Sequence, residues 1–300
     1  MNSIAKLLDI QYPIFQGAMA HIARYPLASA VSEAGGLGII AAGGLSSEEL
    51  REQIRRTQER TKKPFAVNLM LQMDNIPEQV EVLIEEGVKI VTTGAGTPKP
   101  YLERLKQANI KVFPVIPSVK LAQKMEQLGV DGIIAEGMEA GGHIGETTSM
   151  ALIPQVVQAV AIPVIAAGGI GDGRGMAAAF ALGAQGVQMG TAFLTVAECP
   201  VHENYQQAIL QADDTATVVL HKTKGGAIRG LKNNLTDKEK TNEAFSIEVL
   251  KRATDIGDTE NGAVMAGQIA GLFSEVKPAK ALIEEVYAEA AVICQNIKID

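Results

Sequence analysis

Short, continuously apolar runs alternate with longer amphipathic stretches along the first two thirds of the chain. The run at 164–167, Val-Ile-Ala-Ala, has no polar position, as expected for a strand buried on both faces of a parallel sheet. Eight such runs begin near residues 13, 36, 65, 88, 111, 131, 163 and 185, roughly one strand–helix unit apart. Eight units predict an α/β fold, the TIM (β/α)8 barrel, with an open doubly wound sheet as the alternative.

The stretches between the runs carry residues that commonly begin and end helices. Ser46 and Glu49 have the spacing of a capping box, and Ser118 is placed to cap a helix that starts at Val119. Five predicted helices end, directly before an apolar run, on a residue that readily adopts a left-handed conformation: Gly35, Gly87, Asn109, Gly129 and Gly183. These residues mark five helix-to-strand junctions.

The regular alternation ends after the eighth run, which predicts three regions. Residues 1–199 would form the main part of the barrel, and residues 258–300 would complete it with a last helix. Residues 200–257 would form a small helical insertion, or lid, over the barrel mouth. Within it we expect a short helix at 202–211, a basic loop, and a charged helical tract at 238–252.

Composition narrows the class of protein. A net charge of −7 argues against nucleic acid as a partner, and 47% hydrophobic residues with no Trp fit an aliphatic α/β core. Cys199 and Cys294 lie far apart, which predicts no disulfide scaffold, no zinc site and a reducing, cytoplasmic location. No secretory signal is visible in residues 1–12, and the apolar tract at 156–170 is too short to span a membrane.

Glycine occurs at nearly every predicted strand end, where the active site of a barrel lies. Gly168 and Gly169 follow the seventh run, and Gly190 and Thr191 follow the eighth. Barrels often bind phosphate at this position through backbone N–H groups. Either pair alone could simply make a tight turn, but two adjacent pairs predict a phosphate-binding site.

One histidine stands in a glycine-rich stretch after the sixth run. His143 lies among Gly137, Gly141, Gly142 and Gly145, which let a backbone approach a flat ligand closely. Imidazole can act as a general acid or as a hydrogen-bond donor to a substrate carbonyl. The alternative is a turn histidine bonded to backbone; we expect the functional role.

Other polar residues allow two interpretations. Glu136 and Asn68 end the sixth and third runs, where each would contact either a ligand or a neighbouring loop. His21, His202 and His221 have less constrained neighbours and are expected to be solvated.

A basic segment lies in the predicted insertion. No acidic residue occurs between 215 and 236, and four basic residues surround Gly225 and Gly226: Lys222, Lys224, Arg229 and Lys232. On an acidic protein this patch would either steer an acidic partner or a dinucleotide phosphate, or form an ordinary solvated loop.

Six motifs at the predicted strand ends and junctions are Gln16-Gly-Ala-Met19, Ala34-Gly-Gly-Leu-Gly-Ile39, Phe65-Ala-Val-Asn68, Glu136-Gly-Met-Glu-Ala-Gly-Gly-His143, Ala166-Ala-Gly-Gly-Ile170 and Gln188-Met-Gly-Thr191. Together they resemble the nitronate monooxygenase-like FMN flavoproteins. Three more motifs are Val91-Thr-Thr-Gly-Ala-Gly96, Pro114-Val-Ile-Pro-Ser-Val119 and Val264-Met-Ala-Gly-Gln-Ile-Ala-Gly271. These are most similar to the enoyl-acyl-carrier-protein reductase II group, and the resemblance covers almost the whole chain.

The resemblance implies FMN in the barrel mouth, with its phosphate at Gly168, Gly169, Gly190 and Thr191. The ribityl chain and ring would then lie along a further set: Gly17, Ala18, Met19, Asn68, Glu136, Gly141, Gly142, Gln188, Met189, Met265 and Gln268. NADH or NADPH would reduce the flavin, and an enoyl thioester on acyl carrier protein or coenzyme A would be reduced in turn, as in bacterial fatty acid synthesis. His143 would polarise the thioester carbonyl or protonate the α-carbon. A monovalent cation and a homodimer are also possible.

Two alternatives remain open. In a nitronate monooxygenase, which oxidises alkyl nitronates with O2, the same His143 would serve as base. A phosphate-binding barrel without turnover would bind no flavin. The chain also departs from its relatives after the eighth strand, where they often have Gly-Thr-Arg-Phe and it has Ala192 in place of the arginine.

Overall fold

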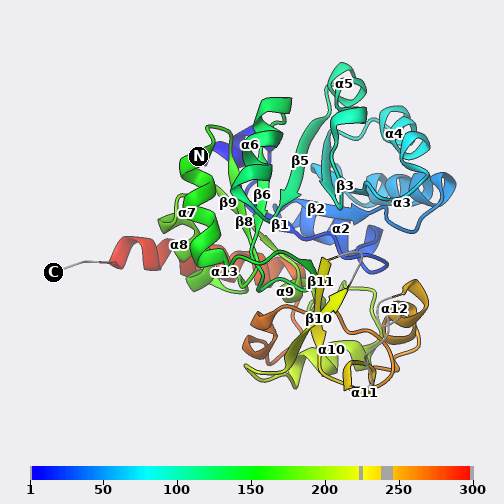
Figure 1. Ribbon diagram of the computed structural model, residues 1–300, viewed down its shortest axis with the longest axis vertical. Coiled ribbons are helices and arrows are strands. Elements are labelled where there is room, and N and C mark those ends of the chain that lie inside the picture. The colour runs from blue at the N-terminus through cyan, green and yellow to red at the C-terminus, as the bar shows by residue number, and fades with distance from the viewer. Residues whose placement is uncertain (1, 223–225, 238–245, 298–300) are drawn as a thin grey trace.

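A ring of eight parallel strands forms the centre of the computed structural model, which describes residues 2–222, 226–237 and 246–297 (Figure 1). Around the ring the order is β1-β9-β8-β6-β5-β4-β3-β2. β1 and β2 close it, because Gln16 N–H donates to Leu37 O and Leu37 N–H donates to Ile14 O, both at 2.9 Å. The predicted TIM barrel is therefore confirmed. Its strands are β1 Ile14–Gln16, β2 Gly38–Ala41, β3 Phe65–Met70, β4 Ile90–Gly94, β5 Lys111–Ile116, β6 Ile133–Glu136, β8 Val164–Ala167 and β9 Gly186–Met189.

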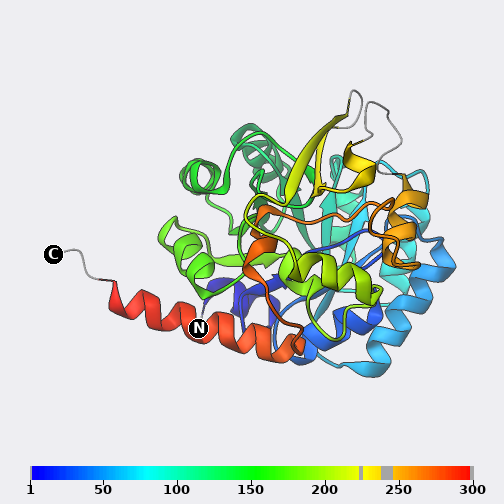
Figure 2. The same cartoon turned by 90° about the horizontal axis from the view of Figure 1, so that it is seen from below.

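Helices surround the strands. Those of the repeating units are α2 Tyr25–Glu33, α3 Ser47–Arg60, α4 Ile76–Glu85, α5 Lys99–Gln107, α6 Val119–Leu128, α7 Ser149–Ala159 and α8 Gly173–Ala181. The helix α13, Ala279–Asn296, packs against α8 and α2 and so lies between the last and the first helix of the ring (Figure 2). No helix in the described ranges is long and apolar enough to cross a membrane.

The predicted helix ends are confirmed. Backbone φ is positive at all five junction residues: 90° at Gly35, 69° at Gly87, 57° at Asn109, 76° at Gly129 and 95° at Gly183. Ser46 and Glu49 form the complete capping box of α3, and the Ser118 hydroxyl accepts from Leu121 N–H at the start of α6. Local sequence therefore sets where each helix stops and the next strand begins.

The inside of the barrel is filled by alternate residues of each strand. Phe15, Ile39, Phe113 and Ile165 are fully buried there, and the rings of Phe15 and Phe113 meet edge to face at 6.2 Å. The short helix α1, Ser3–Leu8, packs its apolar side chains into the same cluster and closes the amino-terminal end of the barrel. A ligand can therefore approach the strands only from their carboxyl ends.

The remaining elements gather beside the barrel mouth, at the bottom of Figure 1. They are α9 Thr191–Leu194, α10 Glu203–Leu210, β10 Thr217–Lys222, β11 Gly226–Leu231, α11 Asn234–Asp237, α12 Ile247–Thr254 and the 3-10 helix η1 Gln268–Leu272. The prediction of a basic loop is wrong for residues 217–222 and 226–231, which form the antiparallel strands β10 and β11, whereas 223–225 lie outside the described residues. Of the charged tract, α12 is helical, whereas 238–245 lie outside the described residues.

Gly38→Ala should destabilise the protein, because an added Cβ would overlap the carbonyl group of Ala28 in α2. Backbone cannot swing aside as a flexible side chain can, so we expect the free energy of unfolding to fall by about 1–3 kcal/mol in urea denaturation followed by circular dichroism. Gly94→Ala is the matched control, since its Cβ would meet no atom within 4 Å, and it should change stability by about 0.5 kcal/mol or less. Equal losses in the two variants would contradict a close contact between α2 and β2.

Candidate active site

A cavity of about 570 Å³ opens at the carboxyl ends of the strands. Fourteen of the sixteen candidate residues line it: Gly17, Ala18, Met19, Asn68, Glu136, Gly141, Gly142, His143, Gly168, Gly169, Gln188, Gly190, Thr191 and Met265. The structure thus brings together residues that are spread over some 250 positions of sequence. This volume falls within the range typical of small-molecule and cofactor sites.

Inward-facing residues at the strand ends form the floor of the cavity. Side chains alternate along a strand, so the layer above the buried core includes Asn68, Glu136 and Gln188. The Asn68 amide donates to Thr92 Oγ1 at 2.9 Å. Met189 follows Gln188 directly, so its side chain lies on the other face of β9. It is 1% exposed and packs in the core outside the barrel, so it is not part of the cavity wall.

Glu136 is the acidic group of the floor. Within the described residues its carboxylate forms no hydrogen bond and no ion pair. Burial without a compensating partner disfavours the charged form and raises the pKa of this carboxyl group from 4.5 to about 7. Near neutral pH it can therefore either donate or accept a hydrogen bond.

Unpaired backbone donors lie beside this floor, in the turns after β8 and β9. Gly168 and Gly169 have φ of 93° and 73°, and among the described residues none accepts a hydrogen bond from their N–H groups. The N–H of Gly190 is likewise without an acceptor in the described chain, and a Cβ added there would meet no atom within 4 Å. All three residues line the cavity, and neighbouring N–H groups without an acceptor form a favourable environment for an anion.

The N-terminus of α8, by contrast, is already satisfied by carboxylates. Gly173 N–H donates to Glu289 Oε2 at 2.8 Å, and Gly175 N–H donates to Asp172 Oδ1 at 3.0 Å. An anion would therefore meet the turn that precedes α8 rather than the helix itself. Ala192 is fully buried in α9, so the position where relatives often carry arginine faces the core.

His143 lies on a strand rather than in a free loop. The strand β7, Gly142–Ile144, pairs antiparallel with β11, and His143 lies opposite Ile228 in the register. The side chain is exposed and lines the cavity. Pairing with β11 fixes the backbone of the histidine at the rim, which the sequence did not predict.

The segment that follows Val264 lies in close backbone contact with the residues just before β7. A Cβ on Gly141 would lie 2.7 Å from the Ala266 carbonyl carbon, and a Cβ on Gly267 would lie 2.6 Å from Glu139 O. Gly267 N–H donates to Thr191 Oγ1 at 2.9 Å, so the Thr191 hydroxyl anchors this segment. Met265 reaches the cavity, whereas Gln268 is exposed and does not line it.

Apolar side chains also line the cavity and are together called its apolar wall. They come from five separate segments and include Met19, Met70, Pro117, Leu121, Ile144 and Leu250. Leu121 is 37% exposed although it is a large apolar residue, and Leu250 reaches the cavity from α12. Motif reasoning missed most of this wall, because its members share no local pattern.

Several other predicted features have structural roles instead. His21 is not simply solvated, since its Nε2 lies 3.0 Å from Asp255 Oδ2 and joins the β1–α2 turn to the end of α12. His202 caps α10, where its Nδ1 accepts from Asn204 N–H. In the basic segment Arg229 is buried and Lys232 exposed; Lys224 and the side chains of His221 and Lys222 lie outside the described residues.

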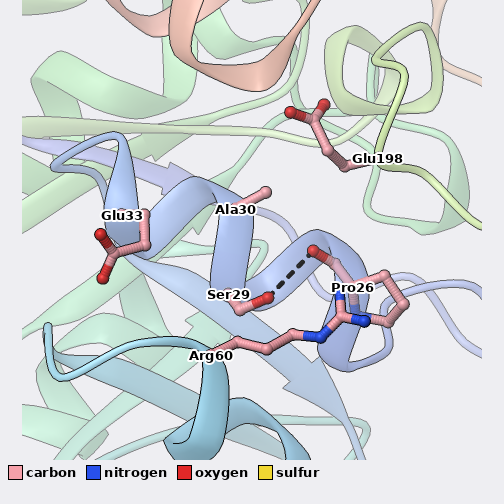
Figure 3. Close-up of a pocket in the computed structure, with 6 residues that line it drawn as sticks. All are labelled: Pro26, Ser29, Ala30, Glu33, Arg60 and Glu198. Carbon is pink, nitrogen blue, oxygen red and sulfur yellow. Dashed lines mark hydrogen bonds between the residues drawn. The ribbon is translucent and has the colours of Figure 1, made fainter.

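A second hollow, of about 390 Å³, lies on the outer surface (Figure 3). Its polar side chains already have partners within the protein. Ser29 donates to backbone, Glu33 accepts from Thr61, and Glu198 accepts from Ala279 N–H, while Arg60 stacks over the Tyr25 ring.

Among the described residues no cluster suitable for a metal ion occurs either. The cavity at the barrel mouth is thus the better candidate site.

Comparison with known proteins agrees with this geometry. The structure of FabK from Thermotoga maritima is 45% identical, covers 98% of this chain and 97% of its own, and superposes with a TM-score of 0.94. A probable nitronate monooxygenase from Staphylococcus saprophyticus is 40% identical over 282 residues, 78% of this chain and 79% of that protein. A 5-hydroxy-7a-methyl-1-oxo-octahydro-1H-indene-4-carboxyl-CoA dehydrogenase from Mycobacterium tuberculosis is 32% identical over 96% of this chain and 95% of its own. The nitronate monooxygenase family model matches residues 2–289, and the chain therefore belongs to that family of flavin-dependent oxidoreductases.

Proposed function

We propose that this protein is an FMN-dependent enoyl-thioester reductase that uses NADH or NADPH and acts on chains carried by acyl carrier protein or coenzyme A. The observation that carries the proposal is that one cavity combines N–H donors without an acceptor in the described part of the chain, a histidine on the rim and an extended apolar wall. The full-length similarity to FabK at 45% identity supports the same activity.

The residues present fit FMN. Its phosphate would accept hydrogen bonds from the N–H groups of Gly168, Gly169 and Gly190, which have no acceptor in the described chain. The remainder would extend over the floor formed by Asn68, Glu136 and Gln188. Bound flavin supplies the hydride transfer that no protein side chain can perform. The protein's part is to orient it, to exclude water and to hold a proton near the substrate.

His143 is the residue that we assign to proton handling. It stands at the rim of the cavity on a strand whose backbone is held by β11. An imidazole there can donate a hydrogen bond to a thioester carbonyl, or give a proton to the α-carbon as the adjacent β-carbon accepts hydride. The reducing equivalents come from the pyridine nucleotide, so the histidine supplies only the proton.

The apolar wall favours a substrate with a hydrocarbon portion. Met70, Leu121 and Ile144 offer surface that an acyl chain would cover, at a gain of about 25 cal/mol for each Å² removed from water. The M. tuberculosis relative is itself named for a carboxyl-CoA thioester. A small alkyl nitronate would leave much of this wall uncovered, but the S. saprophyticus relative keeps nitronate oxidation as the second candidate function.

Purified flavoprotein should consume NADH or NADPH only when an enoyl thioester is present. His143→Ala should retain its flavin and lose turnover by about 100-fold or more, because the proton donor is gone. His202→Asn is the matched control, since asparagine is also a good helix cap and position 202 does not line the cavity. Absence of turnover with every enoyl chain length, with K⁺ or NH₄⁺ supplied, combined with oxygen uptake on alkyl nitronates, would favour the monooxygenase instead.

Gly190→Ala should weaken FMN binding without destabilising the fold. The new Cβ would meet no protein atom within 4 Å, and φ at this residue is −102°, so only a ligand would be obstructed. We expect the Kd for FMN to rise at least about tenfold, a change of roughly 1.4 kcal/mol, in fluorescence titration. Gly94→Ala adds the same methyl group to open space at another point of the cavity, the end of β4, and so tests whether the loss is specific to the turn after β9. Unchanged FMN affinity in Gly190→Ala would place the phosphate elsewhere.

Glu136→Gln should stabilise flavin-free protein increasingly as pH rises. The folded-state pKa of about 7 exceeds the ordinary value of 4.5. The contribution of Glu136 to the stability of the wild type is therefore fully present below pH 4.5 and is lost as pH rises through about 7. The difference in unfolding free energy between variant and wild type should grow by on the order of 2 kcal/mol over this window. Urea unfolding at a series of pH values measures it, and a pH-independent difference would mean that Glu136 titrates normally.

A further inference from the structure

Arg229 is an unusual residue of the hairpin beside the cavity. Its side chain is a long cation on β11, yet the residue is only 3% exposed. Among the described residues no carboxylate lies within ion-pair distance of its guanidinium. Burial lowers the pKa of this arginine, and the nearby Glu139 carboxylate offsets part of that effect. A buried, unpaired cation costs stability, so its contacts indicate what it is used for.

Two N–H groups on one edge of the guanidinium donate to a single backbone carbonyl. Its Nε and Nη2 both donate to Met138 O, each at 3.1 Å, and Nη1 donates to Thr217 Oγ1 at 3.0 Å on the neighbouring strand. Met138 N–H in turn donates to Thr147 O at 2.9 Å. Both polar backbone groups of Met138, its N–H and its C=O, therefore have hydrogen-bond partners.

The backbone of Arg229 holds the other end of the same segment. In the β11–β7 ladder Arg229 lies opposite Gly142, and the adjacent Ile228 lies opposite His143. One residue thus restrains residues 138–142 through its side chain at the start and through its backbone at the end. Between these points the chain passes Gly141 and Gly142, of which the second has φ of 77°. Glycines of this kind give the segment little stiffness of its own.

We propose that Arg229 is the positioning residue of His143: the two hydrogen bonds that it donates to the Met138 carbonyl keep the flexible glycine segment, and hence the imidazole, at the rim of the cavity. The expected effect on catalysis rests on the proposed function, whereas the expected effect on the glycine segment and the His143 ring does not. Arginine suits this task better than lysine, because its rigid planar fork presents two N–H groups to one acceptor.

The test compares Arg229→Lys and Arg229→Gln with Lys232→Gln in the FMN-loaded protein. Lys232→Gln removes the same charge from the exposed end of the same hairpin and touches neither Met138 nor the cavity. Three readouts are taken: hydrogen exchange of residues 138–145, the NMR resonances of the His143 ring, and the two half-reactions. Thr217→Val, which removes only one of the three guanidinium bonds, is included as a mild variant should either Arg229 variant fold poorly.

Both Arg229 variants should show exchange at 138–145 faster by about tenfold or more, and a shifted His143 resonance, with Lys232→Gln unchanged. Thr217→Val should move both readouts in the same direction, by less. Reduction of FMN by NADH should change less than about twofold, whereas reduction of the enoyl thioester should fall at least about tenfold. If exchange and the His143 resonance stay as in wild type, or if protection is lost evenly over the chain, Arg229 does not position His143. If only the thioester reaction is absent in every protein, wild type included, the proposed function fails while the positioning role stands.

Discussion

The site depends on the close approach of two backbones, at Gly141 and at Gly267. Any side chain at either position would occupy space already filled by main-chain atoms of the other segment. This contact brings a segment 126 residues further along the chain against the residues just before the strand that carries His143, and Gly267 N–H donates to Thr191 Oγ1 at the start of α9. The glycines in these motifs therefore serve contacts within the protein as well as ligand binding.

A continuous polar network links the histidine strand to the proposed phosphate site. Arg229 holds Met138, and the adjacent Glu139 carboxylate accepts from Ser149 N–H at 2.9 Å. The Ser149 hydroxyl donates to Gly168 O at 2.8 Å, so the same loop orients the turn whose N–H groups have no acceptor among the described residues. One loop would thus fix the position of the proposed phosphate site relative to His143.

Sequence alone predicted what depends on local patterns. Eight apolar runs and residues such as Gly129 and Asn109 set the barrel and its junctions, because helix ends and strands are encoded within a few positions. Alternation along β9 was also readable, and would have separated the inward Gln188 from the outward Met189. Pairing of β7 with β11 was not, since its partners lie some 85 positions apart and neither strand has a distinctive pattern. The hold of Arg229 on Met138, 91 positions away, is hidden for the same reason.

A crystal structure of the FMN complex tests the central claim most directly. The account predicts phosphate oxygens within hydrogen-bonding distance of the N–H groups of Gly168, Gly169 and Gly190, and the flavin ring on the cavity floor beneath the strand that carries His143. A phosphate bound at another turn, with these three N–H groups facing solvent or side chains, would contradict it.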